Sequence, residues 1–199
     1  MRALFLASAA FALSGCTLGL TAKAPAFLMT LTPDQRPVAS DGGAVETGAV
    51  LTVMTPLVPQ AIATTRLPVA QGQTALAYVK DAVWVEPPAR LFQRLLAETI
   101  RARSGRVVLD PRQFSMDPGA TLSGHLLRFD VDERGATAVV IYEATLSGEA
   151  NQPVRTRRFE ARMAMGQIDA ANASQALNSA ANQVAADVAD WVKRYSAGA

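Results

Sequence analysis

Apolar residues recur at three- and four-residue steps in two parts of the chain, and this spacing predicts two amphipathic helices. The first runs from Ala89 to Ser104. Pro87-Pro88 suit its first turn, where a missing N–H costs nothing, and Gly105 suits its C-cap. The second runs from about Ala171 to Arg194, with Asp169 as its N-cap. The apolar faces are Leu91, Phe92, Leu95, Leu96 and Ile100 in the first helix, and Leu177, Ala181, Val184, Val188, Trp191 and Tyr195 in the second.

Short runs of apolar and β-branched residues predict strands outside the helices. Glu133-Arg134-Gly135 predicts a hairpin turn between two of them. Together the elements predict an α+β fold, a mainly antiparallel sheet of five to seven strands with two long helices packed on one face. The candidate strands are Phe27–Thr32, Ala49–Thr55, a short edge strand Ile62–Arg66 that Pro68 would end, Ala75–Lys80, Arg106–Leu109, Thr121–Asp132, Thr137–Leu146 and Thr156–Met165.

The first sixteen residues, MRALFLASAAFALSGC, follow neither pattern. Arg2 precedes an apolar run from Ala3 to Leu13, and the small residues Ser14 and Gly15 stand directly before Cys16, the only cysteine of the chain. This layout is typical of a secretory signal, because the apolar run is shorter than the roughly 20 residues that a membrane-spanning helix needs. The junction resembles the lipobox of bacterial lipoproteins, in which the cysteine is lipidated and becomes the first residue of the mature protein.

These features predict three parts: a signal peptide at residues 1–15, a lipidated tether at residues 16–26 and a single α+β domain at residues 27–199. Two other interpretations of Cys16 are an incidental cysteine near the cut and a reactive thiol. The thiol is not favoured, because the only histidine, His125, is far away along the chain. Thr17, rather than Asp, follows Cys16. By resemblance to the sorting rule of enteric-type bacteria, this favours the outer membrane over the inner membrane.

Charge and composition exclude some functions. The chain has 19 basic and 17 acidic residues, so it lacks the excess charge of a nucleic-acid-binding protein. A single cysteine excludes an internal disulfide and a multi-cysteine metal site. Arg94 and Glu98 stand at the spacing of a helical ion pair. The most basic stretch of the chain contains Arg155, Arg157, Arg158 and Arg162. Such a stretch is either a solvated face of a strand or a contact for lipid headgroups or an acidic partner.

Catalytic and metal-binding patterns are weak. A hydrolase would need His125 with Ser123 or Ser115, but the chain has no nucleophile elbow. Asp130 and Asp132 lack the loop pattern of a calcium site. Gly42-Gly43 does not lead into a helix, so it is not a phosphate-binding loop. We therefore expect no enzymatic activity, no metal and no cofactor apart from a covalent lipid on Cys16.

Three short motifs, in order, carry a family resemblance. Trp84-Val85-Glu86-Pro87 enters the first helix, Arg94-Leu95-Leu96-Ala97-Glu98 lies within it, and Arg128-Phe129-Asp130 follows in a later strand. With the lipobox-like junction and the final helix containing Trp191, this set resembles the ABC-type transport auxiliary lipoproteins of the PqiC/YmbA-like group.

The resemblance implies a non-enzymatic periplasmic lipoprotein that accompanies an ABC permease and ATPase and docks to an MCE-domain protein. Such Mla- and Pqi-type systems move phospholipid or other hydrophobic substrates between the inner and outer membranes. The resemblance also leaves room for a homo-oligomer. Two alternatives remain, namely an envelope scaffolding lipoprotein that binds cell-wall enzymes and a lipid carrier with its own cavity. The candidate partner-binding residues are Trp84 and Glu86, for which a structural role at the helix entry is favoured, and Arg155, Arg157 and Arg158.

Overall fold

The computed structural model describes residues 25–35, 50–109, 119–148 and 153–196. The expected signal peptide, Cys16 and most of the tether lie outside these ranges, as do Gly42-Gly43 and Ser115. The predictions made for them therefore stay predictions.

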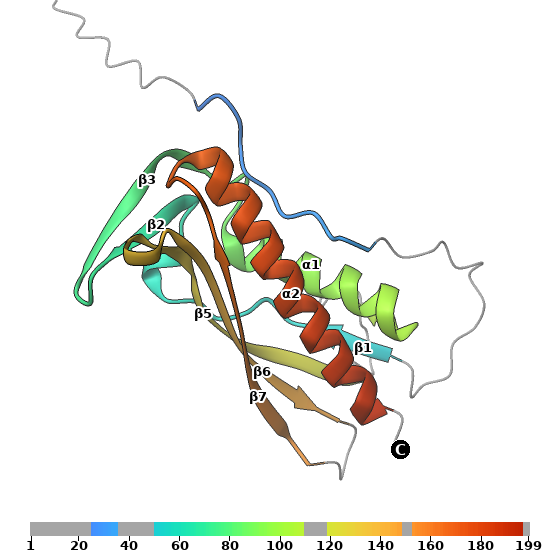
Figure 1. Ribbon diagram of the computed structural model, residues 1–199. Helices are drawn as coiled ribbons and strands as arrows, with labels where there is room; N and C mark the ends of the chain where they lie inside the picture. The colour runs from blue at the N-terminus through green and yellow to red at the C-terminus, as the bar shows by residue number, and fades with distance from the viewer. Residues whose placement is uncertain (1–24, 36–49, 110–118, 149–152, 197–199) are drawn as a thin grey trace, which may run out of the picture.

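Seven strands and two long helices make up an α+β fold, which confirms the predicted class (Figure 1). The elements are β1 (Val50–Val53), β2 (Arg66–Gln71), β3 (Ala75–Val83), α1 (Pro88–Ser104), β4 (Val107–Leu109), β5 (Ala120–Asp132), β6 (Thr137–Ser147), β7 (Arg155–Ala164) and α2 (Ala170–Ser196), with short 3-10 turns η2 (Gln60–Ile62) and η3 (Glu133–Gly135). Within the described ranges, neither helix is long and apolar enough to cross a bilayer.

Strand β5 organises the sheet. Along one edge it pairs antiparallel with β6, which pairs antiparallel with β7. Its other edge is shared by two short pairs: β2 and β3 at its C-terminal end, and β1 and β4 at its N-terminal end. The pairings of β5 with β1 and β2, and of β1 with β4, are parallel. The sheet is thus mixed, and its three antiparallel ladders are the longest.

A β-bulge lies in the middle of β5. The register with β6 shifts between Leu126 and Arg128, so Leu127 is an extra residue on β5. As a result Leu126 and Phe129, although three residues apart, are both buried in the core. Arg128 and Asp130 then face the side of the sheet opposite to the helices.

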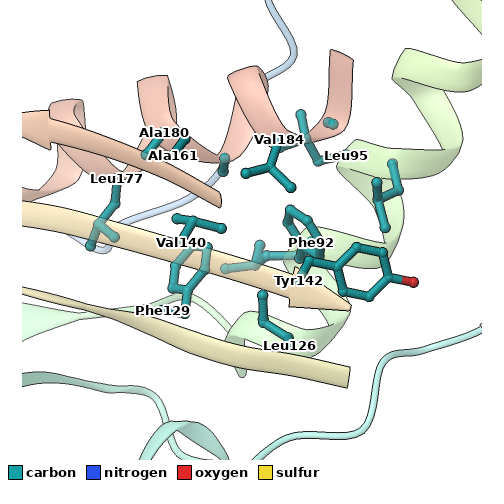
Figure 2. Packing of buried hydrophobic residues seen from close by; sticks show 14 of the residues in the cluster. Phe92, Leu95, Leu126, Phe129, Val140, Tyr142, Ala161, Leu177, Ala180 and Val184 are labelled. Carbon is teal, nitrogen blue, oxygen red and sulfur yellow. The ribbon is translucent and has the colours of Figure 1, made fainter. Parts of the chain in front are cut away.

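The two helices lie side by side and cover one face of the sheet (Figure 1). Their predicted apolar faces form the core, apart from Tyr195, which is 39% exposed. Aromatic rings fill the centre: the ring of Phe92 lies 5.3 Å from that of Tyr142 and 6.4 Å from that of Phe129 (Figure 2). Each fully buried side chain of this size contributes about 1.5–3 kcal/mol.

The predicted helix ends are confirmed. Pro88 is the first residue of α1, and Gly105 takes φ 69° at its C-cap, where its N–H donates to the Arg101 carbonyl at 3.2 Å. At the start of α2, the Asp169 Oδ1 accepts from the N–H of Asn172 at 2.8 Å. A left-handed residue would strain most side chains, so glycine is the natural choice at the end of α1.

Two predicted strands are wrong. Phe27–Thr32 makes only a single bridge, between Met29 and Trp84. In the segment predicted as Ile62–Arg66, Ile62 is the last residue of the turn η2, and the strand β2 starts only at Arg66 and continues through Pro68. Pro68 is tolerated because the register between β2 and β3 shifts there, and proline is accepted at such irregularities.

Candidate functional site

The described segment that follows the tether is fixed to the domain. The N–H of Met29 donates to the Val83 carbonyl at 2.8 Å, and the N–H of Val85 donates to the Met29 carbonyl at 2.9 Å. The segment then runs along α2 (Figure 1). The N–H of Thr32 donates to Asn178 Oδ1 at 2.8 Å, and Asn182 Nδ2 donates to the Thr32 carbonyl at 2.8 Å. The chain that leads from Cys16 is therefore bound to both the sheet and α2.

Asn182 is the central residue of this attachment. Its side chain is buried, and its Oδ1 also accepts from the N–H of Asp34 at 2.9 Å. Thr32 is hydrogen-bonded to Asn178, and Asp34, two residues later, is hydrogen-bonded to Asn182, one turn later in α2. The segment and α2 therefore run in the same direction. Pro25 consequently lies toward the N-terminal end of α2.

Trp84 is a core residue. Its side chain is 1% exposed, and its ring lies 5.4 Å from that of Phe129. The Trp84 Nε1 is buried and has no hydrogen-bond partner among the described residues. Its backbone N–H donates to the Thr65 carbonyl at 2.7 Å. This geometry matches the structural role that the sequence favoured, because a partner could reach the ring only by opening the core.

Glu86 lies at the entry of α1 and forms an ion pair with Arg94. The helical pair of Arg94 with Glu98 that the sequence predicted is not among the ion pairs of the described residues. Side chains of a helix lean toward its N-terminus, so Arg94 in the second turn of α1 reaches back to Glu86, which stands just before the helix. Of the two candidate residues at this step, Glu86 alone is at the surface.

The basic stretch is divided between the two faces of β7. Successive side chains of a strand point to opposite faces. Arg155 and Arg157 point to the side of α2, where they stack on aromatic rings. Arg158 and Arg162 point to the opposite side, where both lie beside Glu160, at 3.8 and 2.6 Å. The stretch is therefore not one basic surface, and among the described ion pairs those of its arginines are the pairs of Arg158 and Arg162 with Glu160.

Arg155 and Arg157 belong to a row of stacked side chains that we call the stacked end. The Arg155 guanidinium lies 4.3 Å over the Tyr195 ring, and that of Arg157 lies 5.2 Å over the Phe159 ring. The ring of Trp191 lies between these two pairs, 5.7 Å from the ring of Phe159 and 5.7 Å from that of Tyr195. The stacking restricts the guanidinium groups and leaves them exposed. Sequence reasoning missed this row, although Trp191 and Tyr195 stand at helical i,i+4 spacing.

Charged side chains from the C-terminal ends of both helices lie near the stacked end. Lys193 and Arg194 are exposed in the last turn of α2. Arg103, in the last turn of α1, forms a bidentate ion pair with Asp190 of α2 at 2.9 and 3.1 Å. That pair raises the pKa of Arg103, because the hydrogen bonds favour its charged form. A shallow groove between β7 and α2 is lined by Arg157, Arg158, Phe159, Glu160, Asp187, Asp190 and Arg194.

Asp130 and Asp132, whose sequence lacks the loop pattern of a calcium site, are hydrogen-bonded within the domain. Arg128 donates to both oxygens of Asp130, the shortest distance being 2.6 Å. Burial raises the pKa of Asp130 more than this hydrogen bonding lowers it. Asp132 Oδ1 accepts from the N–H of Arg134 at 3.1 Å and caps η3. In the part of the chain that the structure describes, no three His, Cys, Asp or Glu residues gather as metal ligands do.

His125 lies exposed on β5, opposite Glu143 of β6. Ser123 is on the same strand, and its carbonyl accepts from the Tyr142 hydroxyl at 2.9 Å. Burial raises the pKa of that hydroxyl, so it acts as a donor and not as a base. Among the residues that the structure describes, no hydrogen bond joins the imidazole to a serine hydroxyl, and Ser115 lies outside them.

The two helices on one face of a mixed sheet define a small α+β domain. The chain belongs to the family of the ABC-type transport auxiliary lipoprotein component, whose family model matches residues 29–189. This confirms the resemblance seen in the sequence motifs and makes the chain a lipoprotein component of an ABC transport system. The family is not a known class of enzyme.

Solved structures show the same fold. A crystal structure of a Xanthomonas campestris protein of the family model DUF330 is 19% identical, with a TM-score of 0.70, and covers 85% of this chain and 95% of that chain. A crystal structure of an uncharacterized protein is 13% identical, with a TM-score of 0.64, and covers 83% of this chain and 99% of that chain. A search of the curated proteins found no match.

Proposed function

We propose that this protein is a periplasmic lipoprotein, anchored to the outer membrane through Cys16, that serves an MCE-type ABC transport system. It would dock to the MCE-domain protein of a system that moves phospholipid or other hydrophobic substrates between the two membranes. The observation that carries the proposal is the family match over residues 29–189, in a chain that has a lipobox-like junction ending at Cys16. A docking subunit with a lipid anchor accounts for both the family match and the lipobox-like junction.

The tether and the fold set an orientation for the anchored protein. Pro25 is nine residues after Cys16, so an extended tether spans roughly 30 Å at most. The 27 residues of α2 extend about 40 Å. Because Pro25 lies toward the N-terminal end of α2, this end is held near the bilayer. The stacked end, at the other end of α2, lies farther into the periplasm.

The stacked end supports docking to an acidic surface. Arg155 and Arg157 are exposed, and stacking on aromatic rings lowers the entropy that they lose on binding. Arg158 is less favoured as a contact, since Glu160 offsets its charge. A membrane anchor raises the local concentration of this surface at the partner without any new contact.

A lipid-carrier role has less support, because aromatic and aliphatic side chains fill the space between the sheet and the helices (Figure 2). The scaffolding alternative differs in its partner. Affinity purification of the full lipidated chain, followed by mass spectrometry, separates the two. Recovery of an MCE-domain protein is the expected result. Recovery of a peptidoglycan synthase in its place would overturn the proposal.

A further inference from the structure

Five large apolar side chains are exposed along the outer edge of the domain, where the tether enters. We call this set the apolar strip. It consists of Phe27, Leu28, Leu76, Tyr78 and Val85, which are 43%, 52%, 57%, 40% and 51% exposed.

The pairing of the strands places the members of the strip along one edge of the sheet. Met29 bridges Trp84 in parallel, which places Leu28 beside Val83 at the edge of the sheet. Val83 pairs with Arg66, whose guanidinium lies 3.7 Å over the ring of Tyr78. Because Met29 and Trp84 point into the core, their neighbours Leu28 and Val85 point outward.

Strand β3 continues the strip toward its hairpin. Leu76 is two residues from Tyr78, so both side chains stand on the same face of β3. The next residue, Val79, points to the opposite face of β3 and is buried in the core. The outward face of this edge is therefore apolar, while its inward face belongs to the core.

We propose that the apolar strip rests on the surface of the bilayer that carries the lipid anchor. This inference rests on the proposed function, because it needs the acyl chains on Cys16. Phe27 and Leu28 come directly after the expected tether, so a tether that spans roughly 30 Å at most lets them reach the headgroups. A contiguous exposed apolar surface of this kind marks an interaction site.

The chemistry of the strip suits a lipid interface more than a dry protein contact. Tyrosine is enriched at the level of the headgroups, where its ring is in apolar surroundings and its hydroxyl is hydrated. Arg66, stacked on Tyr78, and the exposed Lys80 can meet lipid phosphates while their stems cover apolar surface. Asp81 is an acidic neighbour that limits the net positive charge, so the apolar side chains supply most of the attraction.

The contact adds a second attachment beside the anchor. An acyl anchor alone leaves the domain free to turn about its tether. With the strip on the bilayer, the edge formed by β3 faces the membrane and the stacked end points away from it. The arrangement would present Arg155 and Arg157 to a partner in one orientation.

The test uses the full lipidated chain in vesicles of phosphatidylethanolamine and phosphatidylglycerol. A thiol at Leu76→Cys is labelled with a polarity-sensitive fluorophore, since the lipidated Cys16 has no free thiol. Val154→Cys is the matched control, because Val154 is also apolar and exposed but lies just before β7, near the stacked end. Lipids that carry a nitroxide at a shallow acyl position report contact with the bilayer.

The proposal predicts that the emission of the Leu76 label shifts to the blue and is quenched by nitroxide lipids, while the Val154 label shows neither effect. Adding Leu28→Ser and Tyr78→Ser should abolish the quenching and leave the chain on the vesicles. A chain that floats with the vesicles but keeps its Leu76 label in water overturns the strip and leaves the anchor standing. A blue shift without quenching means that a second protein copy covers the strip, which also overturns the proposal. A chain that does not float with the vesicles refutes the anchor and the strip together.

Discussion

The guanidinium group of Arg155 lies 4.3 Å over the ring of Tyr195, so the first residue of β7 is joined to the last turn of α2. The contact holds a positive charge at the end of the domain that is farther from the expected anchor. Arg157 repeats the arrangement on Phe159.

Replacing Arg155 and Arg157 by Gln should weaken docking to the MCE-domain protein. We expect the dissociation constant to rise by roughly tenfold, which corresponds to about 1.4 kcal/mol, because two preorganised charges are lost. Calorimetry with the two purified proteins measures this change. The control is Arg158→Gln with Arg162→Gln, which removes the same charge from the opposite face of β7. Equal weakening by both pairs would contradict the docking role of the stacked end.

Asn182→Ala should loosen the N-terminal segment. The substitution removes the hydrogen bonds of Asn182 to the Thr32 carbonyl and the Asp34 N–H, each worth about 0.5–1.5 kcal/mol where water can replace the lost partner. Amide hydrogen exchange at Thr32 and Asp34 should become faster, while the core strands keep their protection. Gln183→Ala, at the next and exposed position of α2, should leave both rates unchanged. Unaltered exchange in the Asn182 variant would show that other contacts hold the segment.

Trp84→Ala should destabilise the domain by about 3–5 kcal/mol, because it leaves a large cavity beside Phe129. Trp84→Phe should cost less, since it also removes the buried Nε1 that has no acceptor. Urea denaturation measures both changes. A Phe variant with normal stability and no partner binding would instead make Trp84 a binding residue.

Two aspartates should give opposite slopes to the dependence of stability on pH. Hydrogen bonds from Asn172 hold the pKa of Asp169 below its ordinary value of 3.8. The stabilisation by Asp169 is therefore present above pH 3.8 and is lost as the pH falls through its folded-state pKa. Burial raises the pKa of Asp130 above 3.8, so its contribution is greatest below pH 3.8 and is lost as the pH rises through the raised value.

Denaturation curves measured across the acid range check these signs. Asp169→Asn keeps a capping side chain and should flatten the loss of stability in acid. Asp130→Asn should change the slope in the opposite direction. If both variants changed the slope in the same direction, at least one of the two pKa shifts would have the wrong sign.

The local patterns in the sequence predicted the helices and the β5–β6 hairpin well. The apolar residues of α1 and α2 recur over several turns. The proline at the start of α1 and the glycine at its end act through their own backbone geometry. Phe27–Thr32 was predicted as a strand from its apolar residues. Whether such a run pairs with a neighbour depends on distant residues, here Asn178 and Asn182, which draw it onto α2 after one bridge.

The candidate site was less predictable for the same reason. Because successive side chains of a strand point to opposite faces, the sequence alone could have placed Arg155 and Arg157 on one face and Arg158 and Arg162 on the other. Their stacking could not be predicted, because it needs the packing of α2 against β7. The parallel pairing of β1 between β4 and β5 is likewise non-local, since it joins segments separated by α1.

The central claim, that a lipid on Cys16 anchors this docking domain to a membrane, is tested most directly by mass spectrometry of the protein extracted from membranes. The account predicts a chain that begins at Cys16 and carries acyl groups on that residue. The matched controls are Cys16→Ser, which should yield no acylated chain, and Ser14→Ala, which keeps a small residue before the cut and should be processed normally. An unmodified Cys16 in the membrane-extracted protein, or a mature chain that begins at another residue, would contradict the account.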